Sequence, residues 1–164
     1  MKFISDPRCI RRFVRIVAAV IGAATVLAAC GGEETVVSDS ADVTLELVGS
    51  GVNVEVKIEV ADTSAERRRG LSGRDELPAD QGVLFVNDED VTVGFQMADT
   101  TIPLSLAFIS DAGEILHILE MDPCVSASCE VYQPPLPYRL ALEVNQGAFA
   151  QWEIGVGDRV VFLQ

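Results

Sequence analysis

Residues 52–60 alternate strictly between apolar and polar side chains, and this pattern constrains the fold more than any other feature of the chain. The run reads Val-Asn-Val-Glu-Val-Lys-Ile-Glu-Val. Successive side chains of a strand point to opposite faces of a sheet, so the run predicts a strand with one dry face and one wet face. Residues 44–48, joined to it through the turn at 49–51, are its expected hairpin partner.

Further short strand patterns follow almost to the end of the chain. They cover residues 83–86, 91–97, 104–109, 114–121, 138–144 and 159–163. An acidic turn is expected at 87–90. One short helix is predicted from the capping-box pair Thr63 and Glu66 to Gly70, and a second over 147–152, capped by Asn145. About eight strands joined by short links predict a mainly β fold, a compact antiparallel β-sandwich or barrel-like domain with two short helices.

The N-terminus has the pattern of an export signal. Residues 1–15 are basic, and the uncharged run over 16–29 has 14 residues, which is shorter than the ~20 apolar residues that span a bilayer. The run ends in Leu-Ala-Ala before Cys30, which resembles the bacterial lipobox and implies a diacylated N-terminal Cys30. The alternative is an ordinary secretory signal cut after residue 29.

We therefore divide the chain into three segments. Residues 1–29 are the predicted lipoprotein signal peptide, 30–42 a flexible acidic tether, and 43–164 a single β-rich domain. The tether is small, acidic and polar, so it cannot bury enough apolar surface to offset the entropy of ordering it. The predicted location is the cell membrane or the outer membrane, through the lipid, on the extracytoplasmic side.

The charge of the chain limits its partners. After residue 29 there are seven Lys and Arg residues against 24 Asp and Glu residues. Nucleic-acid binding depends on Lys and Arg contacts to phosphates, so we expect no nucleic-acid partner. His117 is the single histidine, which excludes sites that need two imidazoles. We expect no metal, no cofactor and no catalytic residue that the sequence can name.

From residue 63 to residue 160 the chain resembles the family called domain of unknown function 192, whose bacterial and archaeal members are small secreted or lipid-anchored proteins. The matching stretches are Glu66-Arg67-Arg68-Arg69-Gly70-Leu71, Gly82-Val83-Leu84-Phe85-Val86, Phe95 to Leu104, Pro123-Cys124, Cys129, Tyr138, Leu142 to Gly147 and Gly157-Asp158. The resemblance implies a compact β-sandwich-like fold and carries no established activity.

The chain departs from the family pattern in one stretch. Members usually read Phe-Trp-Met-Lys-Asn-Thr followed by Pro-Leu-Asp, whereas this chain has Gln96, Ala98, Asp99 and Ser105 at four of those positions. A cation and an anion are lost together, and this suggests that they form an ion pair in relatives, because losing one alone would strand a charge. If they perform chemistry in relatives instead, this chain has lost it.

Cys124 and Cys129 are predicted to form a disulfide, since export places them in an oxidising compartment. Their spacing also occurs at metal sites, but the chain has no second ligand pair to complete a tetrahedron. His117 alternates with apolar residues, which favours a core or edge position over catalysis. The arginines at 67–69 favour a solvated helix face over an anion site. Glu143 alternates with apolar residues on a strand, so we expect it to face water.

The candidate binding residues are Phe95, Met97, Asp99 and Thr100. Phe95 and Met97 share one strand face, polar residues follow, and Pro103 stiffens the exit of the turn. Pockets are mostly apolar with a few placed polar groups, which this segment provides. The competing interpretation makes the two apolar side chains part of the core and the polar ones ordinary turn residues.

Two classes of function remain. The first is a lipid-anchored, non-catalytic binding or structural module of the cell envelope, whose partner is an envelope protein or a small ligand. The second is an envelope hydrolase that acts on glycan through paired carboxylates. Two carboxyl groups that face each other across a pocket would distinguish the second class from the first.

Overall fold

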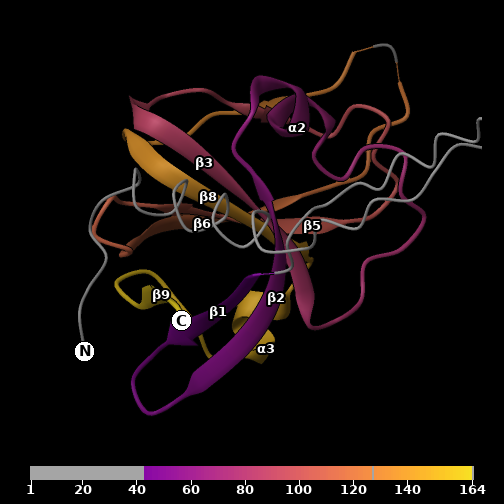
Figure 1. The fold of residues 1–164 in the computed structure, drawn as a ribbon. Helices are drawn as coiled ribbons and strands as arrows, with labels where there is room; N and C mark the ends of the chain where they lie inside the picture. Colours follow the sequence, from indigo (N-terminus) through magenta and orange to yellow (C-terminus); the bar gives the residue numbers. More distant parts are fainter. Residues whose placement is uncertain (1–42, 127, 164) are drawn as a thin grey trace, which may run out of the picture.

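The computed structural model describes residues 43–126 and 128–163 (Figure 1). The predicted signal peptide over 1–29, the lipidation residue Cys30 and the tether over 30–42 lie outside the described residues. No helix within the described residues is long and apolar enough to span a membrane.

Nine strands and two short helices make up the described part of the chain. The strands are β1 (Val43–Val48), β2 (Asn53–Ala61), β3 (Gln81–Val91), β4 (Phe95–Gln96), β5 (Leu104–Ile109), β6 (Ile115–Met121), β7 (Val131–Tyr132), β8 (Tyr138–Asn145) and β9 (Arg159–Phe162). The helices are α2 (Ser64–Arg69) and α3 (Ala148–Gln151). The predicted mainly β fold with two short helices is confirmed.

Seven strands form one sheet in the order β6-β5-β8-β3-β2-β1-β9, and β4 pairs with β7 in a second, small sheet. Neighbours in the large sheet are antiparallel except β2 and β3, which are parallel. A parallel pair needs a long crossover connection, which residues 62–80 with α2 provide. The sequence did not reveal this pair, because a six-residue helix resembles an ordinary link.

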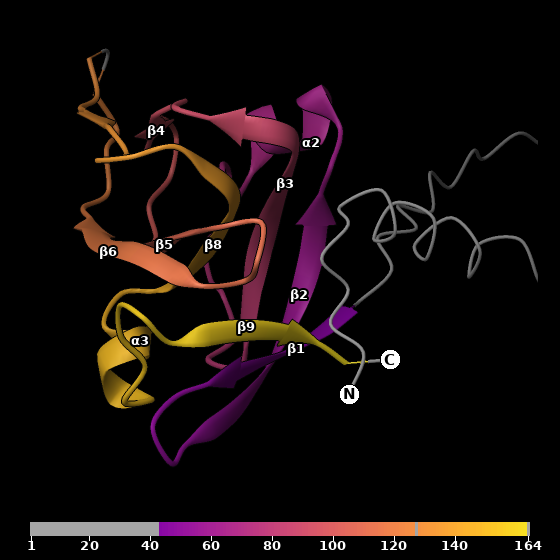
Figure 2. The ribbon, with the colours of Figure 1, turned by 90° about the vertical axis from the view of Figure 1, so that its left-hand side faces the viewer.

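The large sheet curls until its two edge strands meet at one end. Figure 2 shows β9 beside β1. An isolated bridge joins Glu114, just before β6, to Arg159 of β9. The backbone N of Ile115 donates a hydrogen bond to the carbonyl of Asp158 at 2.8 Å. The result is a half-barrel, which is the barrel-like form of the prediction.

The predicted hairpin is confirmed by the pairing of β1 with β2. Val56 and Ile58 are 0% and 1% exposed, whereas Glu55 and Lys57 between and before them are exposed. Val56 lies opposite Leu45 in the antiparallel register. The strict alternation thus places one side of β2 in the core, as its period of two requires.

Helix α2 begins at the predicted capping box. The hydroxyl of Thr63 accepts from the backbone N of Glu66 at 3.2 Å, and the carboxylate of Glu66 accepts from the backbone N of Thr63 at 2.9 Å. The helix ends at Gly70, whose φ of 45° is in the left-handed region. Both ends of α2 therefore lie where the sequence predicts them.

The segment after β3 differs from the prediction. Residues 87–90, predicted as an acidic turn, continue strand β3, and the predicted strand over 91–97 shrinks to the two residues of β4. The reason lies in the partner strand, because β8 starts at Tyr138 and Val91 still pairs with it beyond a register shift. The acidic side chains are tolerated there because they are exposed.

Two apolar clusters occupy the two faces of the curled sheet. The first contains Leu142 and Val144 of β8 and is covered by α3 through Phe149. The second contains Ala141 of β8 and is covered by the segment after α2 through Leu71. We call these the α3 face and the α2 face. Figure 1 shows the two helices on different sides of the sheet.

Candidate functional site

A cavity of about 590 Å³ lies between α2 and the α2 face of the sheet. Its apolar wall comes from Phe85, Phe95, Met97 and Leu104. Its charged groups are the three arginines of α2 and Glu143 of β8. Ligand pockets commonly have this size and this mixture of apolar walls with a few polar groups. The cavity is therefore the candidate functional site.

Three of the four predicted binding residues line this cavity, namely Phe95, Met97 and Thr100. Phe95 is partly buried, whereas Met97 and Thr100 are 1% and 5% exposed. Asp99 is exposed and does not line the cavity. The structure thus brings the apolar and hydroxyl side chains together at one cavity, and their role in binding stays a prediction.

The turn after β4 separates Asp99 from its neighbours. The φ angle of Asp99 is 54°, which is in the left-handed region that Asp tolerates better than most residues. The backbone N of Thr100 donates to the carbonyl of Met97 at 3.0 Å, and the backbone N of Gly73 donates to the carbonyl of Asp99 at 2.9 Å. This tight turn leaves Met97 and Thr100 on the cavity wall and Asp99 in solvent.

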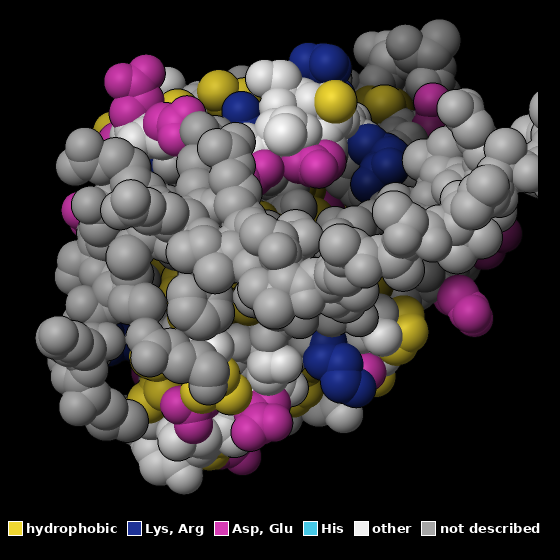
Figure 3. Space-filling model, viewed as in Figure 1, with side chains coloured by type: hydrophobic (Ala, Val, Ile, Leu, Met, Phe, Trp, Pro, Cys, Tyr) yellow, Lys and Arg dark blue, Asp and Glu magenta, His cyan; other side chains and the backbone are white. Residues whose placement is uncertain are grey.

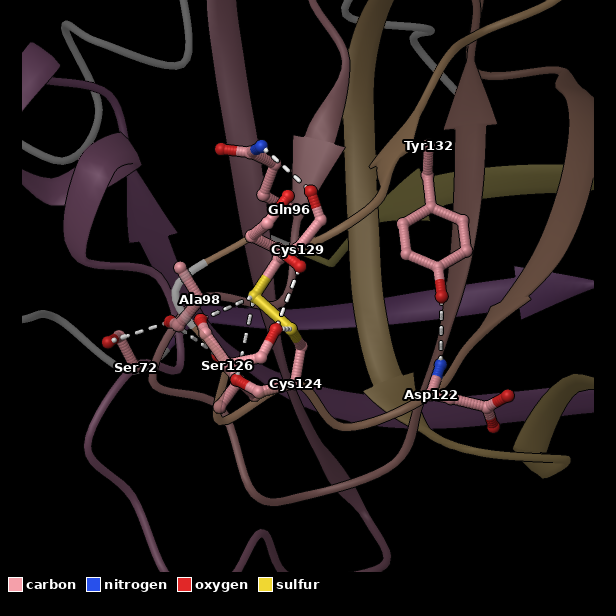
Figure 4. Close-up of a disulfide and its surroundings, with 10 residues drawn as sticks. Ser72, Gln96, Ala98, Asp122, Cys124, Ser126, Cys129 and Tyr132 are labelled. Atoms are coloured by element: carbon pink, nitrogen blue, oxygen red, sulfur yellow. Dashed lines mark hydrogen bonds between the residues drawn. A yellow bond between two sulfur atoms is a disulfide. The ribbon is translucent and has the colours of Figure 1, made fainter.

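The predicted disulfide between Cys124 and Cys129 is confirmed (Figure 4). The backbone N of Cys124 donates to the carbonyl of Thr100 at 3.2 Å, and the side chain of Gln96 donates to the carbonyl of Cys129 at 3.3 Å. Both contacts reach residues that line the cavity. The cross-linked loop therefore supports one wall of the candidate site.

The prediction that Glu143 faces water is wrong. Glu143 is 6% exposed and lies near the middle of the large sheet. Its cross-strand neighbours are Val83 of β3 and Leu106 of β5, both apolar and buried. Alternation alone could not reveal this burial, because it identifies which side of β8 is polar and not what covers that side.

The end of α2 is what covers the Glu143 carboxyl. A Cβ atom built on Gly70 would lie 3.7 Å from Oε2 of Glu143 and 3.2 Å from the Phe85 ring. Glycine is required here by its positive φ, and it also lets the chain pass close to both side chains. In the sequence this glycine marks the end of α2 but does not indicate that Glu143 lies beneath it.

The Glu143 carboxyl has no hydrogen-bond or ion-pair partner among residues 43–126 and 128–163. Burial disfavours its charged form and raises its pKa to about 8. It is therefore largely protonated at neutral pH. A buried polar group without a partner is costly in a folded protein, so this carboxyl needs a functional explanation.

The three arginines of α2 differ in their environment. The guanidinium of Arg67 donates to the carbonyls of Asp62 at 2.6 Å and Val86 at 2.8 Å, so it ties the helix to the sheet. Arg68 and Arg69 are exposed on the rim of the cavity. Figure 3 shows basic side chains in dark blue over the α2 region of this face.

Tyr138 also lines the cavity. Its hydroxyl donates to the carbonyl of Val93 at 2.8 Å, and burial raises its pKa to about 12. Its ring lies 6.2 Å from the Phe95 ring, which in turn meets the Phe85 ring edge-on at 5.1 Å. The hydroxyl is thus occupied, and the three aromatic residues contribute apolar surface to the cavity.

His117 does not line the cavity. It lies on β6, an edge strand of the large sheet, and its ring stacks near the Phe108 ring with centroids 6.5 Å apart. This is the edge position that the sequence favoured. The structure gives it no carboxylate or thiol partner among the described residues.

The two positions that differ together from the family pattern have different neighbours. Ala98 lines the cavity, and its carbonyl accepts from the Ser72 hydroxyl at 3.2 Å. Ser105 is fully buried, donates to the Glu120 carboxylate at 2.7 Å and accepts from the backbone N of Gly147 at 2.8 Å. These different surroundings do not by themselves indicate an ion pair between positions 98 and 105 in relatives.

The half-barrel, the cross-linked loop and the cavity beneath α2 define a small β-rich module with a lined recess. Sequence comparison identifies its family: residues 42–162 match the family described as an uncharacterized ACR, DUF192. The chain belongs to the domain of unknown function 192 family, as its motifs predicted.

The solved structures that share this fold include two that are 27% and 28% identical to this chain. One is a protein from Sinorhizobium meliloti 1021 described as a proposed transcription regulator; it is 27% identical, with a TM-score of 0.69 over 75% of this chain and 95% of that chain. The other is a protein of unknown function from Novosphingobium aromaticivorans DSM 12444; it is 28% identical, with a TM-score of 0.68 over 85% and 98%. No curated protein matches the chain.

Proposed function

We propose that this protein is a lipid-anchored, non-catalytic binding module of the cell envelope, and that the cavity beneath α2 holds its ligand. The observation that carries the proposal is the Glu143 carboxyl, 6% exposed and without a partner among the described residues, on the wall of that cavity. A ligand that bonds to this carboxyl would offset the cost of burying it.

The envelope location is supported by the N-terminal sequence. The basic stretch, the apolar run and Cys30 have the order of a lipoprotein signal. The disulfide between Cys124 and Cys129 fits an exported protein, because cytosolic thiols are normally kept reduced. The membrane is the first partner through the lipid, and the cavity ligand, a small molecule or part of an envelope protein, is the second.

We propose no nucleic-acid partner, although one structural neighbour is described as a proposed transcription regulator. Beyond residue 29 this chain has seven basic and 24 acidic side chains. That charge repels phosphate backbones, whereas DNA-binding surfaces need clustered Lys and Arg. We therefore do not extend the description of that neighbour to this chain.

Hydrolysis of glycan is not the function that the cavity favours. Glycoside hydrolases of the common type need two carboxyl groups on either side of the scissile bond. Glu143 is the one carboxyl among the described residues that line the cavity. Nor do the described residues contain a group of three His, Cys, Asp or Glu side chains placed to hold a metal ion.

Fractionation of cells tests the anchor. The wild-type chain should sediment with membranes and partition into detergent, because two or three acyl chains anchor a protein stably. Cys30→Ser should be released or remain uncleaved, and Cys9→Ser, a cysteine inside the predicted signal, is the matched control. A Cys30→Ser protein that fractionates and migrates like the wild type would contradict the anchor.

Two-dimensional NMR of the full chain in uncharged detergent tests the cavity. We would titrate a panel of amines, carboxylic acids, zwitterions and sugars. At least one class should shift the amide signals of Phe95, Thr100 and Glu143, and Ala98→Trp, which narrows the cavity, should weaken that response. Asp99→Asn, next in the chain but outside the cavity, is the control. If no compound of the panel shifts these amide signals, the proposal is contradicted.

A further inference from the structure

We propose that the cavity ligand is an organic zwitterion: a primary ammonium group that pairs with Glu143, an apolar spacer along the aromatic wall, and an anionic end that meets Arg68 and Arg69. This inference rests on the proposed function, because it names the ligand class of the same cavity. Three independent features of the cavity support it, one for each part of the ligand.

No positive charge among the described residues pairs with the Glu143 carboxyl on the cavity wall. Glu143 sits between Val83 and Leu106, and none of the α2 arginines forms an ion pair or a hydrogen bond with it. A carboxylate in such surroundings becomes stable when an opposite charge approaches it closely. An ammonium group from the ligand supplies this charge and donates hydrogen bonds to both carboxylate oxygens.

Aromatic side chains line the cavity beside Glu143. The Phe85 ring lies close to Glu143, because both approach the same point beside Gly70. Phe95 meets Phe85 edge-on with centroids 5.1 Å apart and is itself partly exposed. Aromatic faces attract ammonium groups and also bury methylene chains. A short aliphatic spacer therefore fits this wall.

The outer rim of the cavity is basic. Arg68 and Arg69 lie in the last turn of α2, exposed and lining the cavity, whereas the guanidinium of Arg67 is held by two backbone carbonyls. A simple amine would be repelled by this rim on its way to Glu143. A ligand that carries a carboxylate or phosphate at its outer end gains an attraction there, because arginine binds such groups through its planar fork of donors.

The protonation states make the pairing measurable. The other titratable side chains that line the cavity are the three arginines of α2 and Tyr138 of β8. Tyr138 stays neutral because burial raises its pKa to about 12. Glu143 is thus the group that changes state: it gives up its proton when the ammonium binds, and the affinity rises with pH up to about 8.

Calorimetry with 6-aminohexanoate on the full chain in uncharged detergent tests the inference. Titrations near neutral pH, in two buffers that differ in ionisation enthalpy, should show release of about one proton per bound ligand. Hexylamine, which lacks the anion, and hexanoate, which lacks the ammonium, should each bind at least about tenfold more weakly. 5-Aminopentanoate and 8-aminooctanoate then define the spacer length.

Three variants assign the two ends. Glu143→Gln keeps the shape of the side chain, and it should abolish proton release and weaken 6-aminohexanoate about tenfold or more. The double variant Arg68→Gln and Arg69→Gln should lower the affinity for 6-aminohexanoate to that for hexylamine without weakening hexylamine. Glu89→Gln, an exposed acidic residue at the end of β3, is the matched control and should change neither affinity nor proton release.

The outcomes separate this inference from the proposed function. The zwitterion inference is wrong if hexanoate binds as tightly as 6-aminohexanoate or if binding releases no proton. It is also wrong if a folded Glu143→Gln protein binds 6-aminohexanoate with unchanged affinity. In that case another class in the NMR panel that still shifts the cavity signals would leave the binding module intact. A panel in which no compound reaches the cavity would overturn both.

Discussion

Leu142 and Glu143 are neighbours in β8, both are almost fully buried, and they lie on opposite faces of one sheet. Leu142 belongs to the α3 face, where α3 and β9 close an apolar cluster. Glu143 lies on the α2 face, where the cavity separates the sheet from α2. One side chain contributes to stability, and the other carries a polar group at a cost to stability.

The difference shows how a small sheet divides its tasks between two faces. The apolar side chains of the α3 face include Leu45, Val56, Phe149 and Val160, all at most 5% exposed. The α2 face keeps a cavity, a carboxyl without a partner and an exposed basic rim. Both faces hold an apolar cluster, but a face that existed for stability alone would also fill the cavity with apolar groups. We therefore propose that the α2 face serves binding as well as stability.

The largest expected effect comes from truncating the α3 face. Leu142→Ala should lower the free energy of unfolding by about 2–5 kcal/mol, because it leaves a hole in a fully buried cluster. Glu143→Leu, one residue further, should stay within about 1 kcal/mol of wild type near pH 5 and exceed it above pH 8, because an apolar side chain replaces a polar group without a partner. Chemical denaturation measures both. Equal losses in the two variants would erase the distinction between the faces.

The second effect is the pH dependence that Glu143 confers. Its pKa is about 8 when folded and near 4.5 when unfolded, so the folded state holds the extra proton. The stability that the protonated carboxyl contributes is fully present below the unfolded-state pKa of 4.5. Between the two pKa values, the free energy of unfolding falls by about 1.4 kcal/mol for each unit by which the pH rises. Glu143→Gln should remove that fall between about pH 5 and 7. Parallel curves for the two proteins across this range would contradict the burial of an unpaired carboxyl.

Reduction of the disulfide should have a similar but smaller effect. Opening the loop between Cys124 and Cys129 should lower the free energy of unfolding by roughly 2 kcal/mol in the chain-entropy model. Because Cys124 bonds to Thr100 on the cavity wall, ligand binding should weaken as well. Thermal unfolding with and without reductant measures the first effect and the NMR titration the second. An unchanged melting temperature would show that the loop is stiff without its cross-link.

The smallest effect contrasts Glu143 with a carboxyl that has a partner. Glu59 of β2 accepts two hydrogen bonds from Arg74, at 2.7 and 2.6 Å, and this pairing lowers the pKa of Glu59. Glu59→Gln should cost below about 1 kcal/mol at neutral pH, since the pair is partly exposed. The loss should vanish in acid, where the wild-type carboxyl is protonated. A loss that grows as the pH falls would have the wrong sign for this pair.

Much of the fold was predictable, because its signals are local. The alternation over 52–60 predicted β2, and the pair Thr63 and Glu66 predicted α2. The parallel pairing of β2 with β3 and the length of β3 were not predictable, because they depend on partners distant in sequence. Likewise Asn145 was expected to cap α3, but it donates to the carbonyl of Leu77 at 2.8 Å instead.

The candidate site was predictable in part. Phe95, Met97 and Thr100 were identified by their apolar and polar order, and they line the cavity. Glu143 was missed because burial depends on tertiary packing. The same alternation of side chains occurs on a strand face that is exposed to solvent and on one that is covered by Gly70. The arginines of α2 were interpreted as a solvated face, since the sequence shows no cavity beside them.

The measurement that tests the account most directly is the titration of the Glu143 side-chain carboxyl by carbon NMR. The free protein should show a midpoint near pH 8, because the group is buried without a partner among the described residues. Saturating 6-aminohexanoate should move the midpoint well below neutral pH, because the ammonium favours the charged form. A midpoint near the ordinary glutamate value of 4.5 in the free protein would contradict the account, since Glu143 would then be solvated or already paired.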